Sequence, residues 1–152
     1  MIVGRLVAHP GPFQLACRVA QYGWWASHID AVLPNGDLLG ARFFGGVQIR
    51  PYNYDHGNFL REEYIEFPAD AEQTAAFYNF LHSQIGKPFD SLAILAFVSE
   101  RDWRSPDKWF CSELFGAALV PANILPADVA DSYSRFTPRD THLASKMYKK
   151  WT

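Results

Sequence analysis

Residues 27–44, with the sequence SHIDAVLPNGDLLGARFF, predict two β-strands joined by a tight turn. Apolar residues lie on both sides of Pro34-Asn35-Gly36-Asp37, and an Asn-Gly pair supplies the positive φ angles that a tight hairpin requires. Because side chains two positions apart in a strand point to the same face, His28 and Asp30 are expected to project together. The stretch therefore predicts an antiparallel hairpin that holds a histidine rigidly.

Segments around this hairpin predict an α+β fold, with a small antiparallel sheet packed against helices. Val47–Arg50 and Glu62–Phe67 are expected to be further strands, separated by a polar loop. Apolar spacing and terminal signals predict helices over residues 11–22, 70–85, 90–98, 111–120 and 137–150. A charged loop over 100–108 leads into the fourth of these helices.

The composition fits one domain spanning residues 1–152. Hydrophobic residues make up 49% of the chain and aromatic residues 16%, which is enough to fill a core and also to line a groove. The net charge is −2, and the sequence shows no basic cluster of the kind that binds nucleic acid. Nucleic acid is therefore not an expected partner.

The N-terminal sequence bears on where the protein is expected to act. Arg5, His9, Pro10 and Pro12 interrupt its apolar residues, so neither a signal peptide nor an integral membrane segment is predicted. The chain has two cysteines, too few for a disulfide framework, which favours a reducing compartment. A cytoplasmic location is the default expectation. A substrate in the cell wall would instead require release by lysis or by a dedicated secretion route.

The segment Trp109-Phe110-Cys111-Ser112-Glu113 places a thiol at the expected start of a helix. Partial positive charge at a helix N-terminus favours the thiolate, and a nearby imidazole would lower the pKa further. A lone cysteine in an apolar segment is more often a small core residue, so a catalytic role for Cys111 depends on finding its base. Glu113 is expected to stabilise the helix N-terminus.

Among the five histidines, His28 is the candidate for that base because a strand fixes its orientation. The others fall in loops or expected helices: His9, His56, His82 and His142. Asp30 is placed to orient the His28 ring, although a bond to strand backbone or exposure to solvent is equally compatible with its position. The two residues could also form half of a metal site, but the sequence places no third ligand, so neither metal nor cofactor is expected.

Three stretches together resemble the permuted, YiiX-like branch of the NlpC superfamily of papain-like cysteine hydrolases. They are Ser27 to Ala41, Gly86-Lys87-Pro88-Phe89-Asp90, and Phe110-Cys111-Ser112-Glu113-Leu114. The resemblance covers roughly Trp25 to Leu119 and implies a circularly permuted papain-like fold, in which the cysteine helix packs on the sheet that presents the histidine. By motif position it implies Cys111 as nucleophile and His28 as general base.

Two positions depart from the pattern of that family. Relatives usually place a third polar residue on the return strand of the hairpin, where this chain has Gly40. Asp30 is therefore the substitute expected from strand geometry rather than from the motif. Phe89 stands where many relatives have tyrosine, so any role of that hydroxyl is absent.

The resemblance implies cleavage of amide bonds, such as cell-wall peptide linkages, by a cysteine peptidase or amidase. The expected chemistry is attack by Cys111 to form an acyl-enzyme, with His28 moving the proton and the Cys111 backbone N–H binding the oxyanion. Acyl transfer or thioesterase chemistry on lipid or ester substrates is the alternative, as in the lecithin retinol acyltransferase group. An inactive binding module is a further alternative, which Gly40 permits. The expected partner is thus a peptide, a peptidoglycan fragment or a lipid amide.

Three other side chains are candidates for substrate contact. Trp25 would wall a groove beside His28, although paired aromatic residues next to a sheet are more often core. Ser112 follows the expected nucleophile directly. Arg42 would reach the cleft from the return strand of the hairpin.

Overall fold

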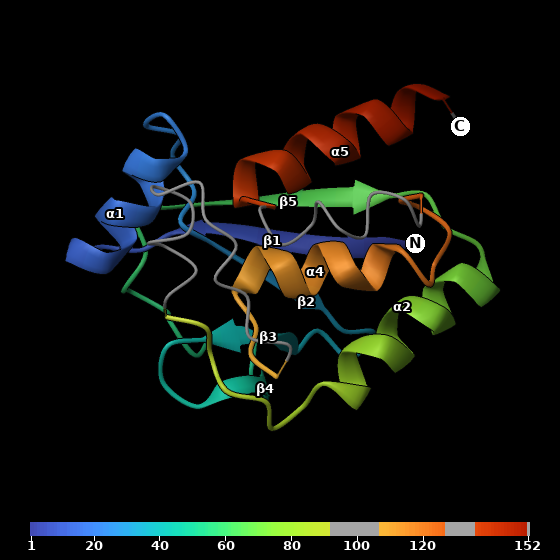
Figure 1. Ribbon diagram of the computed structural model, residues 1–152, viewed down its shortest axis with the longest axis horizontal. Helices are drawn as coiled ribbons and strands as arrows, with labels where there is room; N and C mark the ends of the chain where they lie inside the picture. Colours follow the sequence, from blue (N-terminus) through green and yellow to red (C-terminus); the bar gives the residue numbers. More distant parts are fainter. Residues whose placement is uncertain (92–106, 127–135, 152) are drawn as a thin grey trace.

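The computed structural model describes residues 1–91, 107–126 and 136–151, and shows an α+β protein with one antiparallel sheet (Figure 1). The strands lie in the order β4-β3-β2-β1-β5. Their bounds are Ile2–Ala8 for β1, His28–Val32 for β2, Leu38–Arg42 for β3, Gly46–Arg50 for β4 and Arg61–Phe67 for β5. The helix expected over 90–98 and the loop expected over 100–108 lie largely outside the described residues.

Strand β1 is the element that the sequence did not predict. It pairs with both β2 and β5 and therefore lies inside the sheet. Six of its seven residues are buried, because helices cover one face of the sheet and the 51–60 loop approaches the other. A strand buried on both faces has no apolar-polar alternation, which is the pattern that identifies a strand in sequence.

The β2–β3 hairpin is confirmed, but its turn differs from the expected one. The Gly36 N–H donates to the Leu33 carbonyl at 2.8 Å, and the Leu33 N–H donates to the Asp37 carbonyl at 2.8 Å. Only Gly36 adopts a positive φ, of 91°, whereas Asn35 does not. Pro34 takes the first corner of the turn, where its fixed φ is favourable. The glycine alone therefore adopts the left-handed conformation that was expected of both residues.

Four helices are present in the described ranges, and each was expected. They are α1 (Pro12–Ala20), α2 (Ala71–Ser83), α4 (Cys111–Leu119) and α5 (Pro138–Trp151). Asp70 caps α2, because its carboxylate accepts from the Gln73 N–H at 2.8 Å and the Gln73 side chain accepts from the Asp70 N–H at 3.1 Å. No helix in these ranges is long and apolar enough to span a membrane.

Helix α4 is buried along its whole length. It packs on β2 and β3 and lies between α2 and α5 (Figure 1). A short helix without a polar face is stable only when other elements surround it, which agrees with its sequence. The Phe110 N–H donates to the Glu113 carboxylate at 3.1 Å, so the expected role of Glu113 at the helix N-terminus is confirmed.

The register of β1 and β2 sets which side chains share a face of the sheet. Arg5 is paired with Asp30, and Val7 with His28. Residues directly opposite each other in antiparallel strands point to the same face. The intervening residues of β2 join the hydrophobic core. His28 and Asp30 therefore lie on the face that the 51–60 loop approaches, where Asp55 pairs with Arg5.

Candidate active site

A cavity of about 530 Å³ opens where β2 and β3 stop pairing. The register of these strands joins only Ala31 to Leu39 and Val32 to Leu38, so His28 and Arg42 lie beyond the paired segment. Both residues line the cavity, together with Cys111 at the start of α4. Its volume falls in the range typical of small-molecule sites.

Cys111 is the first residue of α4, as expected, and its side chain is 2% exposed. Burial raises the pKa of the thiol above its ordinary value, although a hydrogen bond from the Ile29 backbone acts in the opposite direction. The resting group is therefore the thiol, and not the thiolate that a helix N-terminus alone would favour. Attack on a carbonyl consequently needs a base that takes the proton during the reaction.

His28 lies close to Asp30 at the edge of this cavity. The Nε2 atom is 2.8 Å from Asp30 Oδ1, but the approach is bent, so it is an electrostatic contact rather than an aligned hydrogen bond. Burial lowers the pKa of His28 more than the charge of Asp30 raises it, so the ring is neutral near pH 7. The carboxylate favours the proton on Nε2, which leaves the Nδ1 lone pair for a reacting group.

The thiol lies beside the strand segment that holds this imidazole. Helix α4 packs on β2, and the backbone of Ile29, the residue that follows His28, acts to lower the pKa of the Cys111 thiol. Cys111 and His28 also line the same cavity. A nucleophile and a base from distant parts of the sequence are thus brought to one place.

Asp30 occupies the space that a side chain at position 40 would need. A Cβ atom on Gly40 would lie 2.1 Å from Asp30 Oδ1, far inside any tolerated contact. The glycine on the return strand therefore leaves room for the carboxylate that contacts His28. The absence of a side chain at Gly40, where the family pattern has a polar residue, is therefore what allows Asp30 to lie beside His28.

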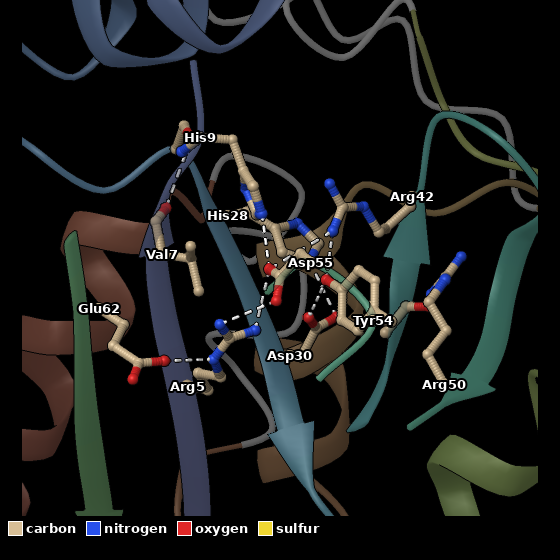
Figure 2. Close-up of polar contacts among 12 residues, drawn as sticks. Arg5, Val7, His9, His28, Asp30, Arg42, Arg50, Tyr54, Asp55 and Glu62 are labelled. Atoms are coloured by element: carbon tan, nitrogen blue, oxygen red, sulfur yellow. Dashed lines mark hydrogen bonds and ion pairs between the residues drawn. The ribbon is translucent and has the colours of Figure 1, made fainter. Parts of the chain in front are cut away.

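The second oxygen of Asp30 is held by Tyr54 from the 51–60 loop (Figure 2). The Tyr54 hydroxyl donates to Asp30 Oδ2 at 2.8 Å and accepts a hydrogen bond from Arg42 Nη1. Burial alone would raise the pKa of Asp30, but the contacts with His28 and Tyr54 and the charge of Arg42 hold it below its usual range. Asp30 is therefore a carboxylate beside a neutral imidazole.

A second histidine, His9, lines the cavity from the position that follows β1. Its Nε2 lies 2.7 Å from Asp55 Oδ2, and Asp55 also accepts two hydrogen bonds of 3.0 Å from Arg5 (Figure 2). Burial, with the charges of Arg42 and of the protonated form of His28, lowers the pKa of His9 to about 4, so this ring is also neutral near pH 7. The His9 and His28 ring centroids are 5.9 Å apart.

Sequence reasoning assigned His9 to a proline-rich loop and Asp55 to a polar loop, and it did not consider Arg50. One feature of the sequence could have indicated this cluster of charged residues. Arg5 interrupts an apolar stretch that forms a buried strand, and arginine is rarely fully buried without an acidic partner. That partner is Asp55, which also binds His9.

Of the three candidates for substrate contact, Arg42 lines the cavity, whereas Trp25 and Ser112 do not. Ser112 is fully buried, and its hydroxyl donates to the backbone carbonyl of Phe136. The Trp25 ring lies 4.1 Å from the Arg61 guanidinium and is partly buried against the core. Of the three, only Arg42 therefore shares the cavity with Cys111.

Within the described ranges, no group of three or more His, Cys, Asp or Glu side chains is arranged to hold a metal ion. In comparisons with known proteins, no family model and no curated protein matches the chain.

Proposed function

We propose that the protein is a cysteine hydrolase that cleaves amide bonds, with Cys111 as nucleophile, His28 as general base and Asp30 as the group that orients the base. One observation supports this above others. A cavity is lined by a thiol at a helix start and by a neutral imidazole that lies 2.8 Å from a buried carboxylate. Nucleophile, base and orienting acid are the three parts of cysteine and serine hydrolase sites.

The proposal includes a circularly permuted papain-like fold. In this chain the histidine strand precedes the cysteine helix, and that helix packs on an antiparallel sheet. This order and packing agree with the family resemblance in the sequence and support the fold assignment.

In the proposed mechanism, His28 Nδ1 takes the proton from Cys111 Sγ as the sulfur attacks the substrate carbonyl carbon. The Cys111 backbone N–H, one of the free donors of the first helical turn, binds the developing oxyanion. The imidazolium then gives its proton to the leaving amine, and the C–N bond breaks to leave a thioester. Water attacks the thioester while His28 takes its proton, and the acid leaves as the thiol is restored.

Acyl transfer or thioesterase chemistry on lipid or ester substrates is the second candidate, because one side of the cavity is aromatic. Its phenylalanines are Phe13, Phe43, Phe44, Phe89 and Phe110. Such a wall suits an acyl chain as well as the side chain of a peptide. The remaining candidate is a protein that binds a ligand in this cavity without catalysing a reaction.

The test is to incubate the protein with a 4-nitrophenyl ester and, separately, with peptidoglycan stem peptides, and to follow protein and products by mass spectrometry. We expect an acyl adduct on Cys111 with the ester, cleavage of a peptide amide bond, and neither in Cys111→Ala. An adduct without peptide cleavage would favour the second candidate. Absence of both an adduct and any product released by the wild-type protein would contradict both enzyme readings and leave the binding module.

A further inference from the structure

We propose that Arg42 and Arg50 form a binding site for a carboxylate group of the substrate, in the cavity that holds Cys111. The inference rests on the proposed function, because it names a class of substrate for the same site. It predicts an amide that bears a carboxylate and an apolar group.

Arg50 is the first of the two cations. It lies at the end of β4, lines the cavity and is partly buried. Its Nη1 donates to the Gly40 carbonyl at 3.2 Å, and its Nη2 donates to the Gly46 and Phe44 carbonyls at 3.2 and 3.4 Å. An arginine has more N–H donors than these bonds use. Among the described residues, no carboxylate forms an ion pair with Arg50, and the negative charge of Asp30 acts on it only from beyond ion-pair distance.

Arg42 is the second cation, and among the residues that the structure describes only one of its terminal nitrogens has a polar partner. Nη1 donates to the Tyr54 hydroxyl and lies 4.0 Å from Asp55 Oδ2. Figure 2 shows the other terminal nitrogen turned away from both of these partners. The guanidinium carbons of Arg42 and Arg50 lie 4.8 and 5.7 Å from the centroid of the Tyr54 ring. One ring therefore holds both cations in the same part of the cavity wall.

The nearby carboxylates do not fill this site, because their oxygens are already bound. Asp55 lines the cavity, but Arg5 contacts both of its oxygens and His9 contacts one of them. Asp30 is not part of the lining, and Tyr54 and His28 contact its two oxygens. The cavity wall therefore carries two arginines, Arg42 and Arg50, and one carboxylate, that of Asp55, which is already paired with Arg5.

The chemistry of such a wall favours an anionic ligand. A partly buried cation without a close acidic partner is unfavourable, and a ligand carboxylate would offset that cost. Guanidinium groups bind carboxylates with two parallel hydrogen bonds, which adds orientation to affinity. Three phenylalanines that pack on one another line the same cavity as the two arginines. The ring centroids of Phe13 and Phe43 are 5.5 Å apart, and those of Phe43 and Phe89 are 6.0 Å apart. These rings would contact the apolar part of the same ligand.

Two thiol reagents of nearly equal size test the charge preference directly. Iodoacetate and iodoacetamide both form a C–S bond with Cys111 and release iodide, but only iodoacetate carries a carboxylate. The measured quantity is the ratio of their rate constants at Cys111, divided by the same ratio for glutathione. We expect this normalised ratio to exceed one in the wild type and to fall roughly tenfold in Arg50→Gln, the effect of about one charge-assisted hydrogen bond.

The matched control is Lys149→Gln, which removes a surface cation that pairs with Glu66 at 2.9 Å outside the cavity. It is expected to leave the normalised ratio unchanged. If Arg50→Gln does not fold, the salt dependence of the wild type replaces it. Raising KCl from about 0.05 to about 0.5 M should lower the iodoacetate preference without changing the iodoacetamide rate, because salt screens the attraction.

The outcomes separate the two proposals. A normalised ratio near one in the wild type, or one that Arg50→Gln or salt does not lower, would overturn the carboxylate site while leaving Cys111 as a reactive thiol. Failure of Cys111 to react with either reagent would overturn the proposed function, and the carboxylate site with it. A normalised ratio that falls in Arg50→Gln but not in Lys149→Gln supports the carboxylate site.

Discussion

Asp30→Asn is expected to lower the rate of Cys111 acylation by roughly 10²- to 10⁴-fold with little change in the fold. The substitution keeps the shape of the side chain but removes its charge. An amide N–H facing His28 Nε2 would favour the tautomer with its proton on Nδ1, which is the nitrogen that must act as base. Single-turnover kinetics with a 4-nitrophenyl ester measure the rate, and circular dichroism checks the fold.

Gly40→Ala gives an independent route to the same result. The added Cβ would lie 2.1 Å from Asp30 Oδ1, so the carboxylate must move although its charge is kept. Asp37→Asn in the turn of the same hairpin is the matched control, because the Asp37 carboxylate contacts Asn35 in that turn, away from Asp30 and His28. We expect Gly40→Ala to slow acylation and Asp37→Asn to leave it unchanged. A wild-type rate in Asp30→Asn would show that Asp30 does not orient the base.

Asp55→Ala is expected to lower the free energy of unfolding by about 3–5 kcal/mol, because it leaves Arg5 buried without its bidentate partner. Arg5 is 2% exposed and Asp55 is 5% exposed. Chemical denaturation of the wild type and the variant measures the difference. Glu62→Gln is the matched control, because Glu62 contacts Arg5 from a position that is 35% exposed. This substitution should lower the free energy of unfolding by less than about 1 kcal/mol.

The double variant Arg5→Met/Asp55→Ala tests the reason for that loss. Removing both buried charges should recover part of the stability that Asp55→Ala alone loses, because the buried guanidinium that lost its bidentate partner is then absent as well. The wild type should also lose stability in acid. The contacts with Arg5 and His9 lower the pKa of Asp55 below its ordinary 3.8 although burial opposes them, so stability present above about pH 4 is lost as the pH falls through the folded-state pKa. Equal stability of Asp55→Ala and the wild type would contradict the assigned role of the pair.

The parts of the site that sequence predicted are those fixed by local geometry. His28 and Asp30 are two residues apart on one strand, and Cys111 begins a helix, so short-range periodicity and helix-start signals located all three. Gly40 was recognised as a departure from a family pattern. Its physical reason, the space taken by Asp30, required the distance between the two strands.

The parts that sequence missed depend on contacts between distant segments. Tyr54 and Asp55 lie in a loop whose polar composition predicts exposure, yet they bind Asp30 and Arg5 across the sheet. The effect of burial on the pKa of the Cys111 thiol could not be predicted either, because the field of a helix start is a local effect, whereas burial depends on the whole fold.

The most direct test of the central claim is the rate of iodoacetamide labelling at Cys111 relative to Cys17 near neutral pH, in the wild type and in His28→Ala. Cys17 is a matched thiol, because it is 3% exposed, burial raises its pKa to about 12, and it does not line the cavity. His82→Ala, on the exposed side of α2, controls for loss of a histidine. We predict that Cys111 reacts at least roughly tenfold faster than Cys17 and that only His28→Ala removes this advantage. Equally slow labelling of both cysteines, or an advantage that persists in His28→Ala, would contradict the account.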